Sequence, residues 1–328
     1  MPQAAPEQLT LFDRGPDMAK IREVSAALKR RTRAPQTHVA YDCDWRAFEA
    51  WCVSAGRLPL PASAETLALY AASRLDGGAA SLRASTVQRH VAAIAFRHKS
   101  AGLAVPDRSE ARAIIEGARR QRLEQPRQRS AFTPAMLRKI GAKLVRAGTA
   151  EAARTRALLS LGIATGLRRS NLVALDLADV SFRSRKGVLV TVRRSKTDQT
   201  GRGAQIGVFR GSRESTCPVR CLRAWLAFRG SAPGPLFTRL REHGPTLERL
   251  QAQWVNLEVK AAVALIGLPP AGFGAHSLRA GFVTTAHNSG TDVLGIMEVT
   301  GHKSAEMVKR YLRNADPFGA RNPLARAL

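Results

Sequence analysis

The chain has 328 residues, of which 45% are hydrophobic, and it contains no long apolar run. This length leaves room for two domains with cores of their own, and without an apolar stretch of about 20 residues a membrane-spanning class is excluded. The 52 Lys and Arg residues outnumber the 25 Asp and Glu residues, and the formal charge of +27 predicts a polyanion, nucleic acid above all, as partner. Genomic base bias also produces Arg- and Ala-rich chains, but bias alone does not explain so few acidic residues.

The N-terminus and the cysteines indicate the compartment. Residues 1–16 contain Pro and Gln without apolar periodicity, so we expect a flexible tail. Because they lack the apolar stretch of a signal peptide, we expect a cytoplasmic, nucleoid-associated bacterial protein. The sequence has no glycine-rich nucleotide-binding loop, and its cysteines have no zinc-type spacing, so we expect reduced thiols, no cofactor and no metal. The four cysteines are Cys43, Cys52, Cys217 and Cys221.

The first third of the chain is predicted to be a bundle of helices. From Met18 the pattern is helical, and an apolar stripe at the spacing of a core-facing helix follows at Tyr41, Trp45, Phe48 and Cys52. Further helices are predicted at 64–75, from an N-cap at Ser85 onward, and at 109–123.

The helix that begins at Ser85 carries polar side chains away from its apolar stripe. Arg and Gln side chains fit purine edges in a major groove, while the other basic side chains of this region suit phosphate contacts better. An ordinary solvated face is the alternative. The candidate DNA contacts are Arg83, Gln88, Arg89, Arg97, Lys99, Arg119, Arg120 and Arg122.

A boundary between two domains is predicted at residues 125–132. This segment is polar and lacks apolar periodicity, which is typical of an interdomain linker. Thr133 and Pro134 follow it and suit the N-cap and first position of a helix. We therefore assign residues 17–124 to one helical domain and residues 133–328 to a second, mostly helical one.

The second domain is predicted to contain one hairpin among its helices. An apolar helix ends at Gly166, and another helix follows at about 169–175. Two β-rich runs, 187–193 and 205–209, flank a polar turn and predict the hairpin. Three more helices are predicted. One begins near His276, one spans 292–299, and the last carries Tyr311.

Six side chains of this domain suit chemistry at a phosphodiester. Two guanidiniums can bind the non-bridging oxygens, a lysine can protonate a leaving alkoxide, and a tyrosine can attack phosphorus. None of these roles requires a metal. Singly, each has a structural alternative: a surface arginine, a solvated loop lysine, a capping or core histidine, a packing aromatic. The six are Arg168, Lys196, His276, Arg279, His302 and Tyr311.

Three motifs carry five of these residues: A-T-G-L-R-R-S-N-L at 164–172, H-S-L-R-A-G at 276–281 and G-H-K-S-A-E-M-V-K-R-Y at 301–311. The order Arg, Lys, His-x-x-Arg, His, Tyr resembles the tyrosine recombinase, or phage integrase, family. Residues 86–103 also resemble a helix of the core-binding domain of its Cre-like members. The resemblance implies a mainly α fold with a small β-sheet, in which a SAM-like helical core-binding domain and a catalytic domain form a C-shaped clamp on double-stranded DNA.

The resemblance also implies roles for the individual residues. By the register of the motif, Arg168 rather than Arg169 binds the scissile phosphate together with Arg279, and His276 is a proton acceptor or hydrogen-bond partner. The family usually has an acidic residue three positions after the first arginine, where this chain has Asn171. An amide still forms hydrogen bonds but lacks the charge that would orient the site.

The remaining implied roles belong to the leaving group, the phosphate and the nucleophile. Lys196, on the hairpin loop, protonates the departing 5′ oxygen, and His302 hydrogen-bonds the scissile phosphate. Tyr311 becomes a 3′-phosphotyrosine. The implied assembly is a homotetramer on two DNA sites, and accessory proteins are left open.

Two other functions stay open beside a site-specific recombinase that integrates or excises a mobile element. A type IB-like topoisomerase or telomere resolvase would use the same site without exchange between partners. A non-catalytic DNA-binding regulator would keep the fold with a decayed site, although six retained positions argue against decay. Strand transfer and trapping of a covalent adduct separate these functions.

Overall fold

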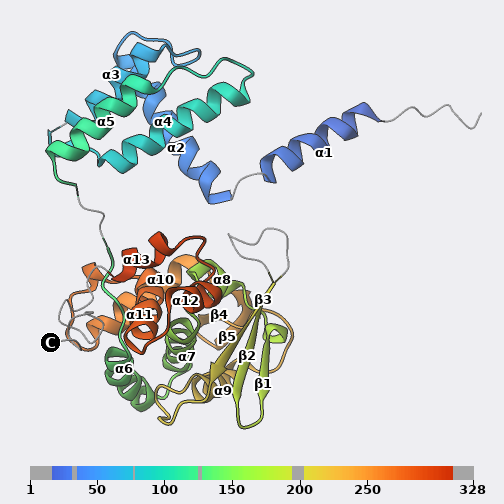
Figure 1. The fold of residues 1–328 in the computed structure, drawn as a ribbon. Helices are drawn as coiled ribbons and strands as arrows, with labels where there is room; N and C mark the ends of the chain where they lie inside the picture. The colour runs from blue at the N-terminus through green and yellow to red at the C-terminus, as the bar shows by residue number, and fades with distance from the viewer. Residues whose placement is uncertain (1–16, 32–34, 77, 125–127, 194–202, 313–328) are drawn as a thin grey trace, which may run out of the picture. The chain divides into compact units, whose positions relative to one another are not determined.

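The computed structural model describes residues 17–31, 35–76, 78–124, 128–193 and 203–312 (Figure 1). The predicted tail at 1–16 lies outside these ranges. The chain separates into two compact units, Met1–Pro126 and Arg127–Leu328. In the described ranges, no helix has the length and apolar character to cross a membrane. Helices dominate both units and the strands form only small sheets, as predicted.

The first unit is helical and has an aromatic core. Trp45, Phe48 and Cys52 of the predicted stripe are buried, and Tyr41 is half-buried. The Phe48 ring packs edge-on against Tyr70, with ring centroids 5.0 Å apart. The elements are α1 (Met18–Arg31), α2 (Pro35–Ser54), α3 (Ala64–Asp76), a 3-10 turn (Gly78–Ala80), α4 (Ala84–Ser100) and α5 (Ser109–Gln121).

The start of α4 differs from the prediction. The helix begins at Ala84 with Arg83 as N-cap, so the predicted N-cap at Ser85 is wrong. The carboxylate of Glu124 accepts hydrogen bonds from the backbone N–H of Ala84 at 3.1 and 3.2 Å. A side chain 40 residues away thus satisfies an N–H that a local cap would otherwise have served.

The second unit contains the other helices and all the strands that the structure describes. They are α6 (Pro134–Ala147), α7 (Ala150–Thr165), α8 (Arg169–Ala174), a 3-10 turn (Leu177–Asp179), β1 (Val180–Arg183), β2 (Gly187–Val192), β3 (Ala204–Phe209), α9 (Pro218–Arg229), β4 (Thr238–Arg241), β5 (Gly244–Arg249), α10 (Ala252–Ala264), a 3-10 turn (Pro270–Gly272), α11 (Ala275–Asn288), α12 (Val293–Thr300) and α13 (Ala305–Leu312).

Helix α7 runs through the middle of this unit, between α6, α9 and α11 (Figure 1). Nearly all its side chains are buried, which suits an element covered on every side. It includes Arg154, whose guanidinium donates to Glu258 of α10 at 2.6 Å and to the Thr238 carbonyl at 3.0 Å. Thr155 donates a further hydrogen bond to the same carboxylate. This buried ion pair ties α7 to α10.

Local sequence signals predicted two further elements correctly. Thr133 is the N-cap of α6, its hydroxyl accepting from the Met136 N–H at 3.2 Å, with Pro134 at the first position. The predicted hairpin consists of β2 and β3, paired antiparallel from Gly187–Phe209 to Val192–Ala204. Strand β1 extends it to a three-stranded sheet that the sequence did not reveal.

Candidate active site

Arg279 is the centre of the site. It lies in the second turn of α11 and is only 3% exposed. Its Nη1 donates to the Gly166 carbonyl at 2.8 Å, and its Nη2 lies 2.9 Å from Nε2 of His302. The Tyr311 hydroxyl lies within electrostatic range of this guanidinium. One buried cation therefore joins three of the motifs that the sequence analysis singled out.

The protonation of His302 follows from its neighbours. The Thr300 hydroxyl donates to the Ile296 carbonyl at 2.6 Å, so it can only accept from the imidazole Nδ1, also 2.6 Å away. Nδ1 then carries the ring proton, and Nε2 presents its lone pair to the N–H of Arg279. A protonated imidazole would point an N–H at that guanidinium. The network therefore requires neutral His302.

The pKa of His302 agrees with this tautomer. Burial, and then the charges of Arg279 and Arg168, lower its pKa to about 4. Thr300 and Arg279 occupy the two ring nitrogens in the described structure, an arrangement that motif spacing does not contain. The hydrogen bond of His302 to the scissile phosphate stays a prediction.

Tyr311 lies on α13, close to His302, with ring centroids 5.5 Å apart. The helix is anchored by Val308, which is fully buried in a small cluster with Val283 of α11 and Ile296 of α12. This packing brings the phenol of the same chain to the site, beside His302 and within electrostatic range of Arg279.

Arg168 is presented by a glycine turn. Gly166 ends α7 in the left-handed conformation, φ 60°, and a side chain there would come within 2.9 Å of the Phe282 ring and 3.2 Å of Thr300. The chain then turns, and Arg168 is the N-cap of α8 with extended backbone. Its charge lowers the pKa of Arg279, so the two guanidiniums lie within electrostatic range of each other.

The site concentrates positive charge. Burial, followed by the charge of Arg168, lowers the pKa of Arg279 to about 10, which still leaves it cationic at neutral pH. His276 is exposed at the start of α11, but partial desolvation and the nearby charges of Arg279, Arg169, Arg168 and Arg129 lower its pKa as well. Mutual repulsion of this kind is relieved by a bound anion, as expected for a phosphate site.

The other predicted site residues have different outcomes. Lys196 lies outside the described residues, so its role stays a prediction. Asn171 is buried on α8, where its carbonyl oxygen accepts a hydrogen bond from Ser170 at 3.4 Å. Its predicted influence on Arg168 is not tested by these contacts.

Residues that the motifs did not reveal complete the site. Thr300 immediately precedes the Gly-His pair and sets its tautomer, and Gly166 supplies a carbonyl to Arg279. Arg129, which we had placed in the linker, lies close enough to lower the pKa of His276. The sequence shows a threonine at position 300, but it does not show which groups hydrogen-bond to the hydroxyl.

In the first unit, a buried carboxylate orients one of the candidate DNA contacts. Asp44 accepts hydrogen bonds from Nε and Nη2 of Arg89 at 2.7 and 2.9 Å, and it lies 3.1 Å from Nε2 of His90. The Tyr70 hydroxyl reaches the other ring nitrogen at 2.7 Å. Arg89 remains half exposed, so this network fixes its direction without burying it.

Other candidate contacts also have intramolecular partners. Arg97 pairs with Asp42 at 2.8 Å, and Arg119 donates to the Gln88 side chain at 3.1 Å. Arg122 donates to the Leu82 carbonyl and the Ser81 hydroxyl, which ties the end of α5 to the turn before α4. Lys99 and Arg120 are exposed, and Arg83 is half-buried at the start of α4. Contact of these eight residues with DNA stays a prediction.

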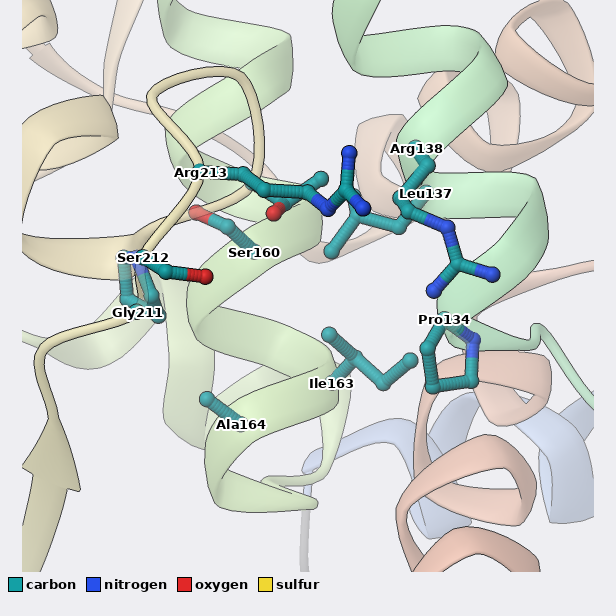
Figure 2. A pocket seen from close by; sticks show the side chains of 11 residues that line it. Pro134, Leu137, Arg138, Ser160, Ile163, Ala164, Gly211, Ser212 and Arg213 are labelled. Carbon is teal, nitrogen blue, oxygen red and sulfur yellow. The ribbon is translucent and has the colours of Figure 1, made fainter.

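A separate pocket of about 320 Å³ lies between α6, α7 and the loop before α9 (Figure 2). The guanidiniums of Arg138 and Arg213 extend over an apolar floor that includes Leu137 and Ile163. None of the five predicted catalytic residues that the structure describes lines it. The pocket is therefore distinct from the site around Arg279.

The fold and this set of side chains are those of a tyrosine recombinase. Residues 133–317 match the phage integrase family, and the chain belongs to that family. It is 35% identical over 305 residues to an integrase/recombinase XerD homolog of Selenomonas ruminantium, covering 90% of this chain and 87% of the relative. It is 23% identical to recombinase Cre of Escherichia phage P1, covering 83% and 82% of the two chains.

Solved structures of integrases share the fold. The Tn1549 transposon integrase in complex with transposon right end DNA superposes with a TM-score of 0.65 at 16% identity, covering 94% of this chain and 97% of that one. A lambda integrase dimer bound to a COC′ core site superposes with a TM-score of 0.58 at 17% identity, covering 91% and 96%.

Proposed function

We propose that this protein is a site-specific recombinase that cuts double-stranded DNA through a covalent bond to Tyr311 and rejoins it to a new partner. The observation that carries the proposal is the convergence on Arg279, whose guanidinium lies 2.9 Å from His302 and within electrostatic range of Tyr311 of the same chain. Membership of the phage integrase family supports the reaction class. Because the phenol lies at the site of its own chain, each protomer is proposed to cut the strand that it binds.

Cleavage exchanges one phosphodiester bond for another. The Tyr311 oxygen bonds to phosphorus, the bond from phosphorus to the 5′ oxygen breaks, and the 3′ end stays on the enzyme. The phenol proton passes to His276, whose lowered pKa keeps it neutral and able to accept. Lys196 supplies a proton to the leaving 5′ oxygen. In the second step the 5′ hydroxyl of another strand attacks the phosphotyrosine, and the phenol leaves.

The positive charge around Tyr311 provides the driving force for attack. A phenol with a pKa of about 10 is only about one part in a thousand ionised at pH 7. Arg168 and Arg279 are proposed to bind the phosphate oxygens, which gain negative charge as phosphorus becomes five-coordinate. Because the guanidinium of Arg279 is already held by Gly166 and His302, it needs no reorganisation in the transition state.

His302 is proposed to position Arg279. Its Nε2 lone pair accepts from the guanidinium, and Thr300 holds the ring by Nδ1. In the described arrangement Thr300 and Arg279 occupy both ring nitrogens, and the predicted hydrogen bond to the scissile phosphate remains a second proposed role of His302. A neutral imidazole at this position also adds no further repulsion to the two arginines.

The proposed partner is double-stranded DNA, bound by a helical core-binding domain at 17–124 and a catalytic domain at 133–328, with a linker at 125–132. The XerD homolog and Cre are named as recombinases, and the integrase structures include complexes with DNA. Exchange between two duplexes is proposed to need four protomers on two sites.

The test uses a duplex with a nick next to the cleavage position, which traps the covalent adduct by releasing the short fragment. The parent should form a protein–DNA adduct that survives denaturation. Tyr311→Phe should bind the duplex with unchanged affinity and form none. A surviving adduct in this variant would overturn the proposal. Transfer of label between two duplexes then distinguishes a recombinase from a topoisomerase.

A further inference from the structure

We call residues 128–132 the connecting segment. These residues form hydrogen bonds with the rest of the second unit. Ser130 N–H donates to the Gly272 carbonyl at 3.0 Å, and Phe132 N–H donates to the Ser277 carbonyl at 2.9 Å. The Arg129 guanidinium donates to the Ala271 carbonyl at 2.5 Å. The segment therefore follows the start of α11, the helix that carries His276 and Arg279.

Gln128, the first described residue of this segment, contacts a different helix. Its side-chain Nε2 donates to the Arg310 carbonyl at 2.7 Å, across 182 residues of sequence. Arg310 immediately precedes Tyr311 in the last turn of α13. Carbonyls in the last turn of a helix have no partner within the helix, so a side chain from elsewhere is needed to satisfy them.

Helix α13 is short and packs through one small apolar cluster. It spans eight residues, and Val308 is its one fully buried side chain. So short a helix has little stability of its own and takes its orientation from its contacts. The hydrogen bond from Gln128 restrains the peptide group immediately before Tyr311. A small rotation of the helix at that peptide would displace the phenol.

We propose that Gln128 is a positioning residue for the nucleophile, holding the end of α13 so that the Tyr311 hydroxyl stays at Arg279. The inference rests on the proposed function of Tyr311. Gln128 lies at the start of the second unit, so the same hydrogen bond links the beginning of the catalytic domain to the nucleophile helix.

The test compares substitutions that keep or remove the donor at similar length. Gln128→Met removes the N–H, and Gln128→Lys restores a donor at the end of an unbranched chain. The rate of adduct formation is measured at saturating nicked duplex, together with the dissociation constant for intact duplex and the thermal midpoint. Gln121→Ala, an exposed amide of α5, is the matched control.

Gln128→Met should form the adduct between about 10- and 100-fold more slowly, the range expected when a reacting group is misplaced by about 1 Å. Its DNA affinity and thermal midpoint should match those of the parent. Gln128→Lys should recover most of the rate, and Gln121→Ala should keep all of it.

Two results would overturn the inference: cleavage by Gln128→Met at the parental rate, or a rate for Gln128→Lys as low as that of Gln128→Met. Tyr311→Phe is assayed beside them. An adduct in that variant defeats the proposed function itself. Its absence, with Gln128→Met at the parental rate, defeats only the role of Gln128.

Discussion

The guanidinium of Arg279 donates to the unprotonated Nε2 of His302 across 2.9 Å, although 23 residues separate them in sequence. Both groups are almost completely buried, and burial followed by the charge of Arg279 lowers the pKa of His302. The pair is stable because only one member carries charge. A neutral histidine thus serves as the acceptor that holds a buried arginine in place.

Removing the Thr300 hydroxyl should disturb this pair. Thr300→Val keeps the side-chain shape but leaves the Nδ1–H of His302 buried without an acceptor, at a cost of about 1–3 kcal/mol. Adduct formation should slow as the ring loses its orientation. Urea unfolding and the nicked-duplex assay check both effects. Thr300→Ser, which keeps the hydroxyl, should stay close to the parent, and equal stability of the valine and parent proteins would contradict the assigned tautomer.

The stability of the protein should fall at mildly acid pH because of His302. Its pKa is about 4 in the folded protein and about 6.5 when unfolded, so between these values the unfolded chain binds the extra proton. Stability should therefore be full above about pH 6.5 and decline as the pH falls toward 4, by about 3 kcal/mol in total.

Unfolding midpoints between pH 4 and 8 measure this dependence. Burial also lowers the pKa of His90, and partial burial that of His276, so both contribute acid sensitivity of their own. The informative quantity is the difference between the parent and His302→Gln. That difference should shrink toward pH 4, and a difference independent of pH would show that His302 does not titrate as described.

The buried pair of Arg154 and Glu258 should be sensitive to loss of one charge. Glu258→Gln leaves Arg154 buried without its counter-ion, which costs about 3–5 kcal/mol. Glu248→Gln is the matched control, because Glu248 pairs with Arg239 and Arg241 at the surface and is 47% exposed. The control should lose at most about 1 kcal/mol. Similar losses in the two variants, measured by urea unfolding, would count against the buried pair.

A methyl group at position 281 should separate α11 from the connecting segment. A Cβ on Gly281 would lie 2.0 Å from the Phe132 carbonyl oxygen, so the backbones must move apart, at a cost of about 1–3 kcal/mol or more. Gly117→Ala, in open space on α5, should instead stabilise the protein by about 0.5–1 kcal/mol. A parental thermal midpoint for Gly281→Ala would refute the close approach.

Sequence patterns were sufficient where a signal and its partner lie close together in the chain. Thr133 and Pro134 began a helix as predicted, because capping involves only the next three residues. The hairpin of β2 and β3 was likewise predictable from two β-rich runs on either side of a polar turn. The N-cap predicted at Ser85 was wrong, because Glu124 supplied the partner from 40 residues away.

The sequence by itself determined the class of this protein, since the order and spacing of arginine, histidine and tyrosine in three short motifs record which chemistry the chain carries. Only the tertiary structure decided what those groups do to one another: that Arg279 reaches Gly166 across 113 residues, that His302 is neutral, and that Gln128 donates to the carbonyl before Tyr311. The physical reason is that hydrogen bonds and pKa values depend on distances between atoms, and distances between remote segments arise only when the chain packs.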